Sequence, residues 1–159
     1  MELTLVKSLV DMGYREVLCD QLKLSHKYVK MGIDSVAQFM YSGTLRHHFK
    51  ETAGRGVALQ IYGRKFPVFA RNNWLYDGAE VYVGKIQPSH DFVIFDGKKA
   101  LVSNSIRDQL EEREGFLSSD CQRLREFERE FSELVRSAKQ ITRIRKDLDP
   151  LIKFLNKQE

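Results

Sequence analysis

The sequence is poor in cysteine and proline and contains no long apolar run. Cys19 and Cys121, its only two cysteines, lie far apart and match no Cys-x-x-Cys or metal-ligand spacing. We therefore expect reduced structural thiols, no metal site and a cytoplasmic protein. No apolar stretch approaches the roughly 20 residues needed to cross a bilayer. Glu2 and Asp11 interrupt the first 12 residues, which have neither a basic start nor a cleavage site, so we expect no secretory signal.

The chain also lacks low-complexity segments, internal repeats and linkers rich in proline or glycine. Hydrophobic residues make up 42% of its 159 residues and charged residues 30%, which is typical of a soluble globular protein rather than a disordered one. Its length suits one domain with a real core. We predict a single domain over residues 1–159, with helical extensions over residues 1–31 and 140–159.

The net charge of +4 is modest, but the charges are unevenly distributed. Residues 44–76 contain six basic side chains and one acid, and residues 136–146 contain five basic side chains and no acid. Residues 108–130 contain eight acids, which offset them. The folded chain could therefore present basic faces, although an ordinary solvated surface explains the same pattern.

Apolar periodicity predicts helices in several places. The pattern is helical from Leu3 to Val10 and weaker over residues 17–31. Further helices are predicted over residues 44–53, which end in a glycine-rich stretch, and over residues 66–76.

Short apolar segments bounded by turn residues predict the strands. They cover residues 36–41, 57–62, 79–83 and 115–118, and residues 91–102 form a hairpin that turns at Asp96-Gly97. Strands that alternate with helices predict an α/β sheet with helices on both faces.

A long amphipathic helix follows the last strand. Ser119 and Gln122 have the spacing of a capping box, and we expect the helix to run on toward Ile144 before Pro150 breaks it. Its apolar stripe is Leu124, Phe127, Phe131, Leu134, Val135 and Ala138.

The segment from residue 88 to residue 105 carries the most informative pattern. His90 precedes a buried strand, an Asp96-Gly97 turn, a second strand and Ser103-Asn104. This order resembles the active-site hairpin of the phospholipase D superfamily, whose motif is His-x-Lys, four residues, Asp, six residues, Gly-Ser. Phe92 stands at the lysine position, the spacing from His90 to Asp96 is one residue short, and Ser103-Asn104 replaces Gly-Ser.

A second alignment of the same motif starts from Asp96 instead of His90. It places Ser89 at the position of the nucleophile and Asp91 at the position of the lysine. A shift of one residue along a strand turns its side chains to the opposite face. The two alignments therefore put different side chains at the positions of the nucleophile and the lysine.

The resemblance extends over roughly residues 27–139. Residues 37–42 are similar to a family strand that ends in Tyr-Ser, and residues 54–61 and 75–81 are similar to two later helix-to-strand passages. Residues 114–120 and the long helix are similar to the end of the domain. The resemblance to single-motif members, the small bacterial endonucleases, implies a mixed, mainly parallel sheet with helices on both faces, and a homodimer.

The resemblance also implies a mechanism without metal or cofactor. In the family one histidine attacks phosphorus, its twofold-related copy protonates the leaving oxygen, lysines hold the phosphate, and an acid orients the imidazole. Here His90 is the candidate nucleophile and Asp96 the orienting acid, while Phe92 supplies no positive charge. Removing one such donor typically costs on the order of 100- to 1,000-fold in rate, so we expect catalysis to be lost.

We therefore predict a nucleic-acid-binding protein on a catalytically degenerate scaffold. The expected phosphate contacts are Arg46, Lys50, Arg55, Arg64, Lys65, Arg71, Arg143, Arg145 and Lys146. Two alternatives remain open, which are a divergent nuclease or phosphodiesterase that uses His90, and a protein-interaction or sensor module that recruits a protein partner.

Overall fold

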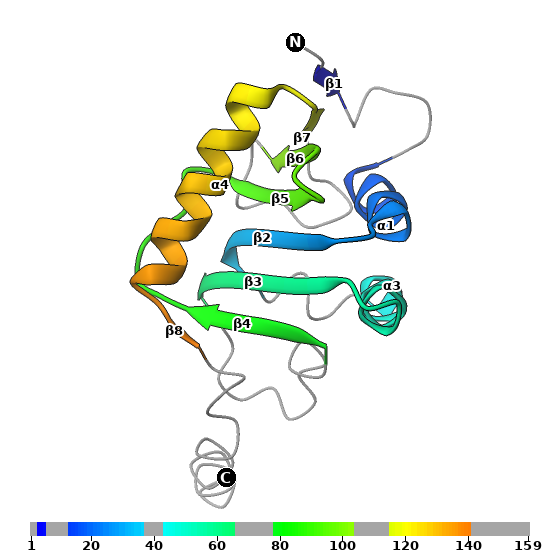
Figure 1. The fold of residues 1–159 in the computed structure, drawn as a ribbon. Coiled ribbons are helices and arrows are strands. Elements are labelled where there is room, and N and C mark those ends of the chain that lie inside the picture. The colour runs from blue at the N-terminus through cyan, green and yellow to red at the C-terminus, as the bar shows by residue number, and fades with distance from the viewer. Residues whose placement is uncertain (1–2, 6–12, 37–42, 66–77, 104–114, 141–159) are drawn as a thin grey trace, which may run out of the picture.

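A mixed β-sheet lies between two layers of helix (Figure 1). The computed structural model describes residues 3–5, 13–36, 43–65, 78–103 and 115–140. Its elements in chain order are β1 (Leu3–Leu5), α1 (Tyr14–Leu24), β2 (Tyr28–Ser35), α3 (Gly43–Gly54), β3 (Ala58–Lys65), β4 (Ala79–Val83), β5 (Asp91–Phe95), β6 (Lys99–Ser103), β7 (Gly115–Ser118), α4 (Cys121–Arg136) and β8 (Lys139–Gln140).

The strand order of the sheet is β1-β7-β6-β5-β2-β3-β4-β8. Among the described strands, β2 pairs in parallel with β3, and β3 with β4. The remaining described pairs, β1/β7, β7/β6, β6/β5, β5/β2 and β4/β8, are antiparallel. The prediction of a mixed α/β sheet is confirmed, but the description of it as mainly parallel holds only for β2, β3 and β4.

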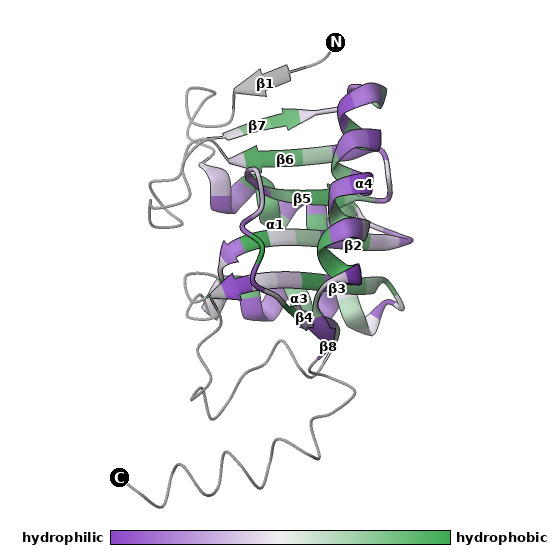
Figure 2. Ribbon diagram, turned by 90° about the vertical axis from the view of Figure 1, so that its left-hand side faces the viewer, coloured by the Kyte–Doolittle hydropathy of each residue, from purple (hydrophilic) through white to green (hydrophobic). Residues whose placement is uncertain are grey.

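The two faces of the sheet bury separate apolar clusters. Helices α1 and α3 cover one face, where Leu18 and Leu45 pack with Met31 and Ile61 of the sheet. Helix α4 crosses the other face and turns a hydrophilic side to solvent (Figure 2). No helix in the described part of the chain is long and apolar enough to span a membrane.

The predicted N-terminal helical extension is wrong at both of its ends. Residues 3–5 form strand β1, which pairs with β7, and residues 28–31 belong to β2. The segment from Met31 to Asp34 is buried without interruption, because β2 is an interior strand with both faces covered. Such strands lack the alternating pattern that identifies a half-exposed strand in the sequence. The predicted strand over residues 36–41 lies almost wholly outside the described residues, as does the predicted helix over residues 66–76.

The later elements agree more closely with the sequence. The strands β4 and β7, the hairpin β5–β6 and the helix α3 lie where they are predicted. The apolar stripe of α4 is confirmed, since it forms the cluster beneath the helix.

Both ends of α4 differ from the prediction. Its N-cap is Asp120, one residue after the predicted Ser119, and the Asp120 side chain forms no capping bond. The helix ends at Arg136, and Lys139 and Gln140 pair with Val83 and Tyr82 instead of continuing the helix. The rest of the predicted C-terminal extension, from residue 141, lies outside the described residues.

Candidate functional site

The two ends of the sheet carry different sets of side chains. At one end, which we call the His90 end, the strands β2 and β3 finish and β5 begins just after His90. At the opposite end, which we call the turn end, β2 begins and the Asp96-Gly97 turn joins β5 to β6. Strand β5 separates His90 from Asp96, so six residue steps place them about 20 Å apart.

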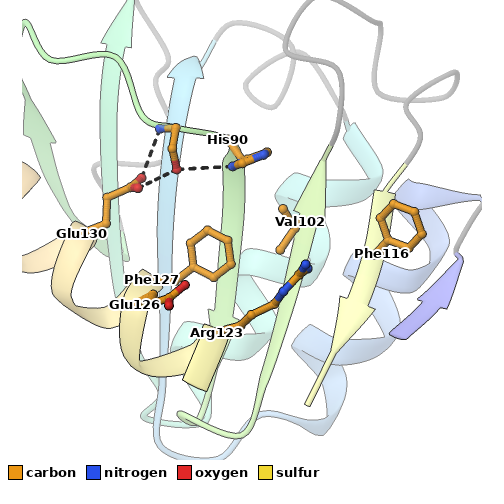
Figure 3. Close-up of a pocket in the computed structure, with 8 residues that line it drawn as sticks. His90, Val102, Phe116, Arg123, Glu126, Phe127 and Glu130 are labelled. Atoms are coloured by element: carbon orange, nitrogen blue, oxygen red, sulfur yellow. Dashed lines mark hydrogen bonds between the residues drawn. The ribbon is translucent and has the colours of Figure 1, made fainter. Parts of the chain in front are cut away.

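A cavity of about 420 Å³ opens between α4 and the strands β5, β6 and β7 at the His90 end (Figure 3). Its lining combines aromatic, acidic and basic side chains. The lining residues are Ser89, His90, Val102, Phe116, Arg123, Glu126, Phe127 and Glu130.

Ser89 connects His90 to the helix. The Nδ1 atom of His90 lies 3.3 Å from Ser89 Oγ, and that hydroxyl donates to Glu130 Oε1 at 2.5 Å. The Ser89 backbone N–H donates to the other Glu130 oxygen at 3.2 Å. The sequence did not identify Glu130 as a site residue, because its partner Ser89 lies 41 residues away and no local pattern relates the two.

Asp96 does not orient His90, contrary to the sequence prediction. Its carboxylate accepts hydrogen bonds from the backbone N–H groups of His26, Lys27 and Tyr28 at 2.7–3.2 Å. Asp96 and Gly97 both have positive φ, as in a type I′ turn. Asp96 is therefore a structural residue that fastens the hairpin to the start of β2.

This environment changes the acidity of Asp96. Partial burial raises the pKa of the carboxyl, but the backbone hydrogen bonds from Lys27, His26 and Tyr28 and the nearby charge of His26 outweigh it. The pKa of Asp96 is consequently held below its usual range.

Phe92 occupies a closed space in the centre of the sheet. It is fully buried, pairs with Gly32 across β5 and β2, and lies with its ring centroid 4.8 Å from that of Phe127 on α4. A Cβ atom on Gly32 would come within 2.6 Å of the Phe92 ring. The absence of a side chain at Gly32 thus leaves space for the Phe92 ring, and helix α4 covers that ring.

The alternative alignment also provides no cation. Asp91 is 1% exposed and accepts the backbone N–H of Asp34 at 2.9 Å. Asp34, itself buried, forms an ion pair with Arg64 at the ends of β2 and β3. Both candidate lysine positions, Phe92 and Asp91, are therefore buried, and neither is basic.

The predicted phosphate contacts fall into three groups. Arg46 and Lys50 are exposed on α3, as a binding role requires. Arg64 is bound to Asp34, and a guanidinium nitrogen of Arg55 donates to the carbonyl oxygens of Leu22 and Ser25. The remaining predicted contacts lie outside the described side chains: Lys65, Arg71, Arg143, Arg145 and Lys146.

The chemical capacity of the cavity differs from that of a phosphate site. His90 and Arg123 are the basic groups of the cavity, while Glu126 and Glu130 place two carboxylates on its wall. These carboxylates repel the negative charge of a phosphodiester. The described residues contain no group of three or more His, Cys, Asp or Glu side chains that could hold a metal ion.

No family model and no curated protein matches this sequence. Solved structures do match its fold. The phospholipase D family member Nuc from Salmonella typhimurium superposes with a TM-score of 0.68 at 10% identity, over 87% of this chain and 97% of Nuc. NucT from Helicobacter pylori gives a TM-score of 0.65 at 15% identity, over the same shares of the two chains. The chain has a phospholipase D-like fold.

The phospholipase D-like fold also occurs in a larger protein that resembles this chain. TrmBL2, an archaeal chromatin protein with a novel mode of DNA binding, gives a TM-score of 0.64 at 12% identity. The match covers 88% of this chain but only 55% of TrmBL2. At these identities the likeness establishes the fold, and the site must be judged from its own residues.

Proposed function

We propose that this chain binds nucleic acid as a homodimer on a phospholipase D-like scaffold that no longer cleaves phosphodiesters. The observation that carries the proposal is the packing of Phe92. A buried aromatic ring, enclosed by Gly32 and Phe127, stands at the position where the resemblance implies a lysine that holds the phosphate. The second alignment puts the buried carboxylate of Asp91 there instead.

Two further observations support binding rather than another role. The chain carries a net charge of +4 and exposes basic side chains such as Arg46 and Lys50, which favours association with a polyanion. One of its structural neighbours, TrmBL2, is a DNA-binding chromatin protein.

The purified chain is expected to bind a fluorescein-labelled DNA duplex of arbitrary sequence, with strong dependence on salt. For about four phosphate contacts, the affinity falls on the order of 100-fold between 50 and 200 mM salt, because each contact releases condensed counterions. Fluorescence anisotropy titrations at several salt concentrations measure this slope.

Duplexes of unrelated sequence serve as the control and should bind equally well, and light scattering on the protein without DNA should give the mass of two chains. An affinity that does not change with salt would contradict the proposal. A dimer without affinity for DNA or RNA would instead support the protein-interaction alternative.

A divergent phosphodiesterase that uses His90 is the second candidate, because the exposed imidazole lines the cavity beside Ser89. Our proposal predicts that the wild type and His90→Ala hydrolyse bis-p-nitrophenyl phosphate in EDTA no faster than buffer alone. A wild-type rate that disappears in a folded His90→Ala variant would favour the enzyme.

A further inference from the structure

Helix α4 groups most of its exposed charges by sign, and Arg123, which lines the cavity with Glu126 and Glu130, is an exception. At 3.6 residues per turn, Arg125, Arg129 and Arg136 lie within about 40° of one another around the helix axis. We call these three residues the arginine ridge. Glu126, Glu130 and Glu133 follow the neighbouring strip of the same helix surface.

The glutamate strip faces the His90 end of the sheet. Glu126 and Glu130 line the cavity beside His90. The other side of the helix faces the turn end, since Glu128 accepts hydrogen bonds from Tyr28 Oη and Lys30 Nζ at 2.6 and 2.7 Å. The arginine ridge lies between these two sides, on the outward surface of α4.

Exposed lysines also lie at the turn end, but Lys98 and Lys99 are on the side of the sheet that α1 covers, since they line a pocket with Gln21, Leu24 and Ser25. Lys27 precedes β2, and Lys98 and Lys99 follow the Asp96-Gly97 turn; all three are exposed. The hydrogen bonds from residues 26–28 to Asp96 hold the two segments together. Lys98 and Lys99 therefore do not extend the surface formed by the arginine ridge.

The carboxylates at this end are already occupied by partners within the protein. Asp96 accepts three backbone N–H groups, and Glu128 is bound by Tyr28 and Lys30. The three ridge arginines are exposed, and within the described residues none of their side chains forms an ion pair. Their positive charge is thus available to a ligand.

We propose that the arginine ridge binds the phosphate backbone of nucleic acid, on the outward surface of α4 rather than over the His90 cavity. This inference rests on the proposed function and names the surface that performs it. Arg125 and Arg136 are about 16 Å apart along the helix, a distance that covers on the order of five phosphates of one strand along a duplex axis. Guanidinium groups suit this role because they bind phosphate oxygens in a bidentate manner.

The glutamate strip gives the binding surface its direction. A duplex seated on the ridge places its phosphates against the arginines, whereas a duplex seated over the His90 cavity would bring phosphates against both carboxylates. The bound phosphate backbone therefore lies away from His90, the candidate nucleophile that the phospholipase D resemblance implies.

The test compares two double variants that remove equal charge. Arg125→Gln/Arg129→Gln removes two residues of the ridge, and Lys23→Gln/Lys85→Gln removes two exposed basic residues elsewhere. The ridge variant is expected to lose about 50-fold in duplex affinity at 100 mM salt. The slope of log K against log [salt] should shrink by about 1.8, since each contact contributes about 0.9. The matched variant should lose less than about threefold and keep the wild-type slope.

Urea unfolding of each variant checks that the fold is intact, which we expect because the ridge side chains are exposed. If the wild type binds the duplex and the ridge variant binds equally well, the inference fails and the proposed function stands. Equal losses in the two variants also overturn it, because they indicate an effect of total charge. A wild type that binds neither DNA nor RNA refutes the proposed function itself.

Discussion

Replacing Phe92 with alanine lowers the free energy of unfolding by about 4 kcal/mol, and replacing it with lysine lowers it at least as much. The alanine variant loses the packing of a fully buried ring against Gly32 and Phe127. The lysine variant in addition places an unpaired ammonium group in an apolar layer. Urea unfolding followed by circular dichroism measures both effects.

The lysine variant is the more informative of the two because it restores the residue that the phospholipase D resemblance implies. We expect no phosphodiester cleavage from it, since Phe92 is enclosed rather than open to the cavity. Ile86→Ala is the control, because Ile86 is 49% exposed and should change stability by less than about 0.5 kcal/mol. A Phe92→Lys variant as stable as the wild type, with new cleavage activity, would contradict our interpretation of this site.

Asp96→Ala is expected to lower the free energy of unfolding by about 3 kcal/mol, and Asp96→Asn by about 1 kcal/mol. Alanine removes the acceptor for the N–H groups of residues 26–28 and is strained at a positive φ. Asparagine keeps one acceptor oxygen and tolerates the left-handed conformation. Urea unfolding at pH 7 measures the difference between the two variants.

The contribution of Asp96 depends on pH. Its pKa in the folded protein is depressed, so the stabilisation is complete above the unfolded pKa of about 3.9 and is lost as the pH falls through the lower folded pKa. The stability gap between the wild type and Asp96→Asn should therefore close in acid. Asp20→Asn, on α1, is the control and should leave stability within about 0.5 kcal/mol. Equal stability of the alanine and asparagine variants would contradict both the role of the acceptor oxygen and the cost of the positive φ.

Much of the fold could be predicted where neighbouring residues decide the structure. The Asp96-Gly97 pair predicts the hairpin because both positions adopt positive φ, and the spacing from Leu124 to Ala138 predicts the buried face of α4. The strand β2 could not be predicted in the same way, since both of its faces are covered and Met31 to Asp34 are buried without the alternation of a half-exposed strand. The end of α4 was missed because Lys139 and Gln140 pair with β4, more than 50 residues earlier in the chain.

The candidate site was less predictable than the fold, because its contacts join distant segments. Arg64 has the sequence appearance of a free phosphate contact, yet it binds Asp34 where two parallel strands end. Asp96 has the spacing of an acid that serves His90, yet it binds backbone groups at the far end of the hairpin. Only pairing between strands places these side chains.

The sequence alone determined the local structure around the hairpin and the amphipathic helix, and the absence of a lysine at the motif, because these depend on residue identity and short-range spacing. The tertiary structure decided that Phe92 is enclosed, that Asp96 serves the backbone rather than His90, and that Glu126 and Glu130 of α4 line the cavity beside His90. The physical reason is that strand order and helix placement bring together residues 40 to 100 positions apart, and no local pattern encodes such distances.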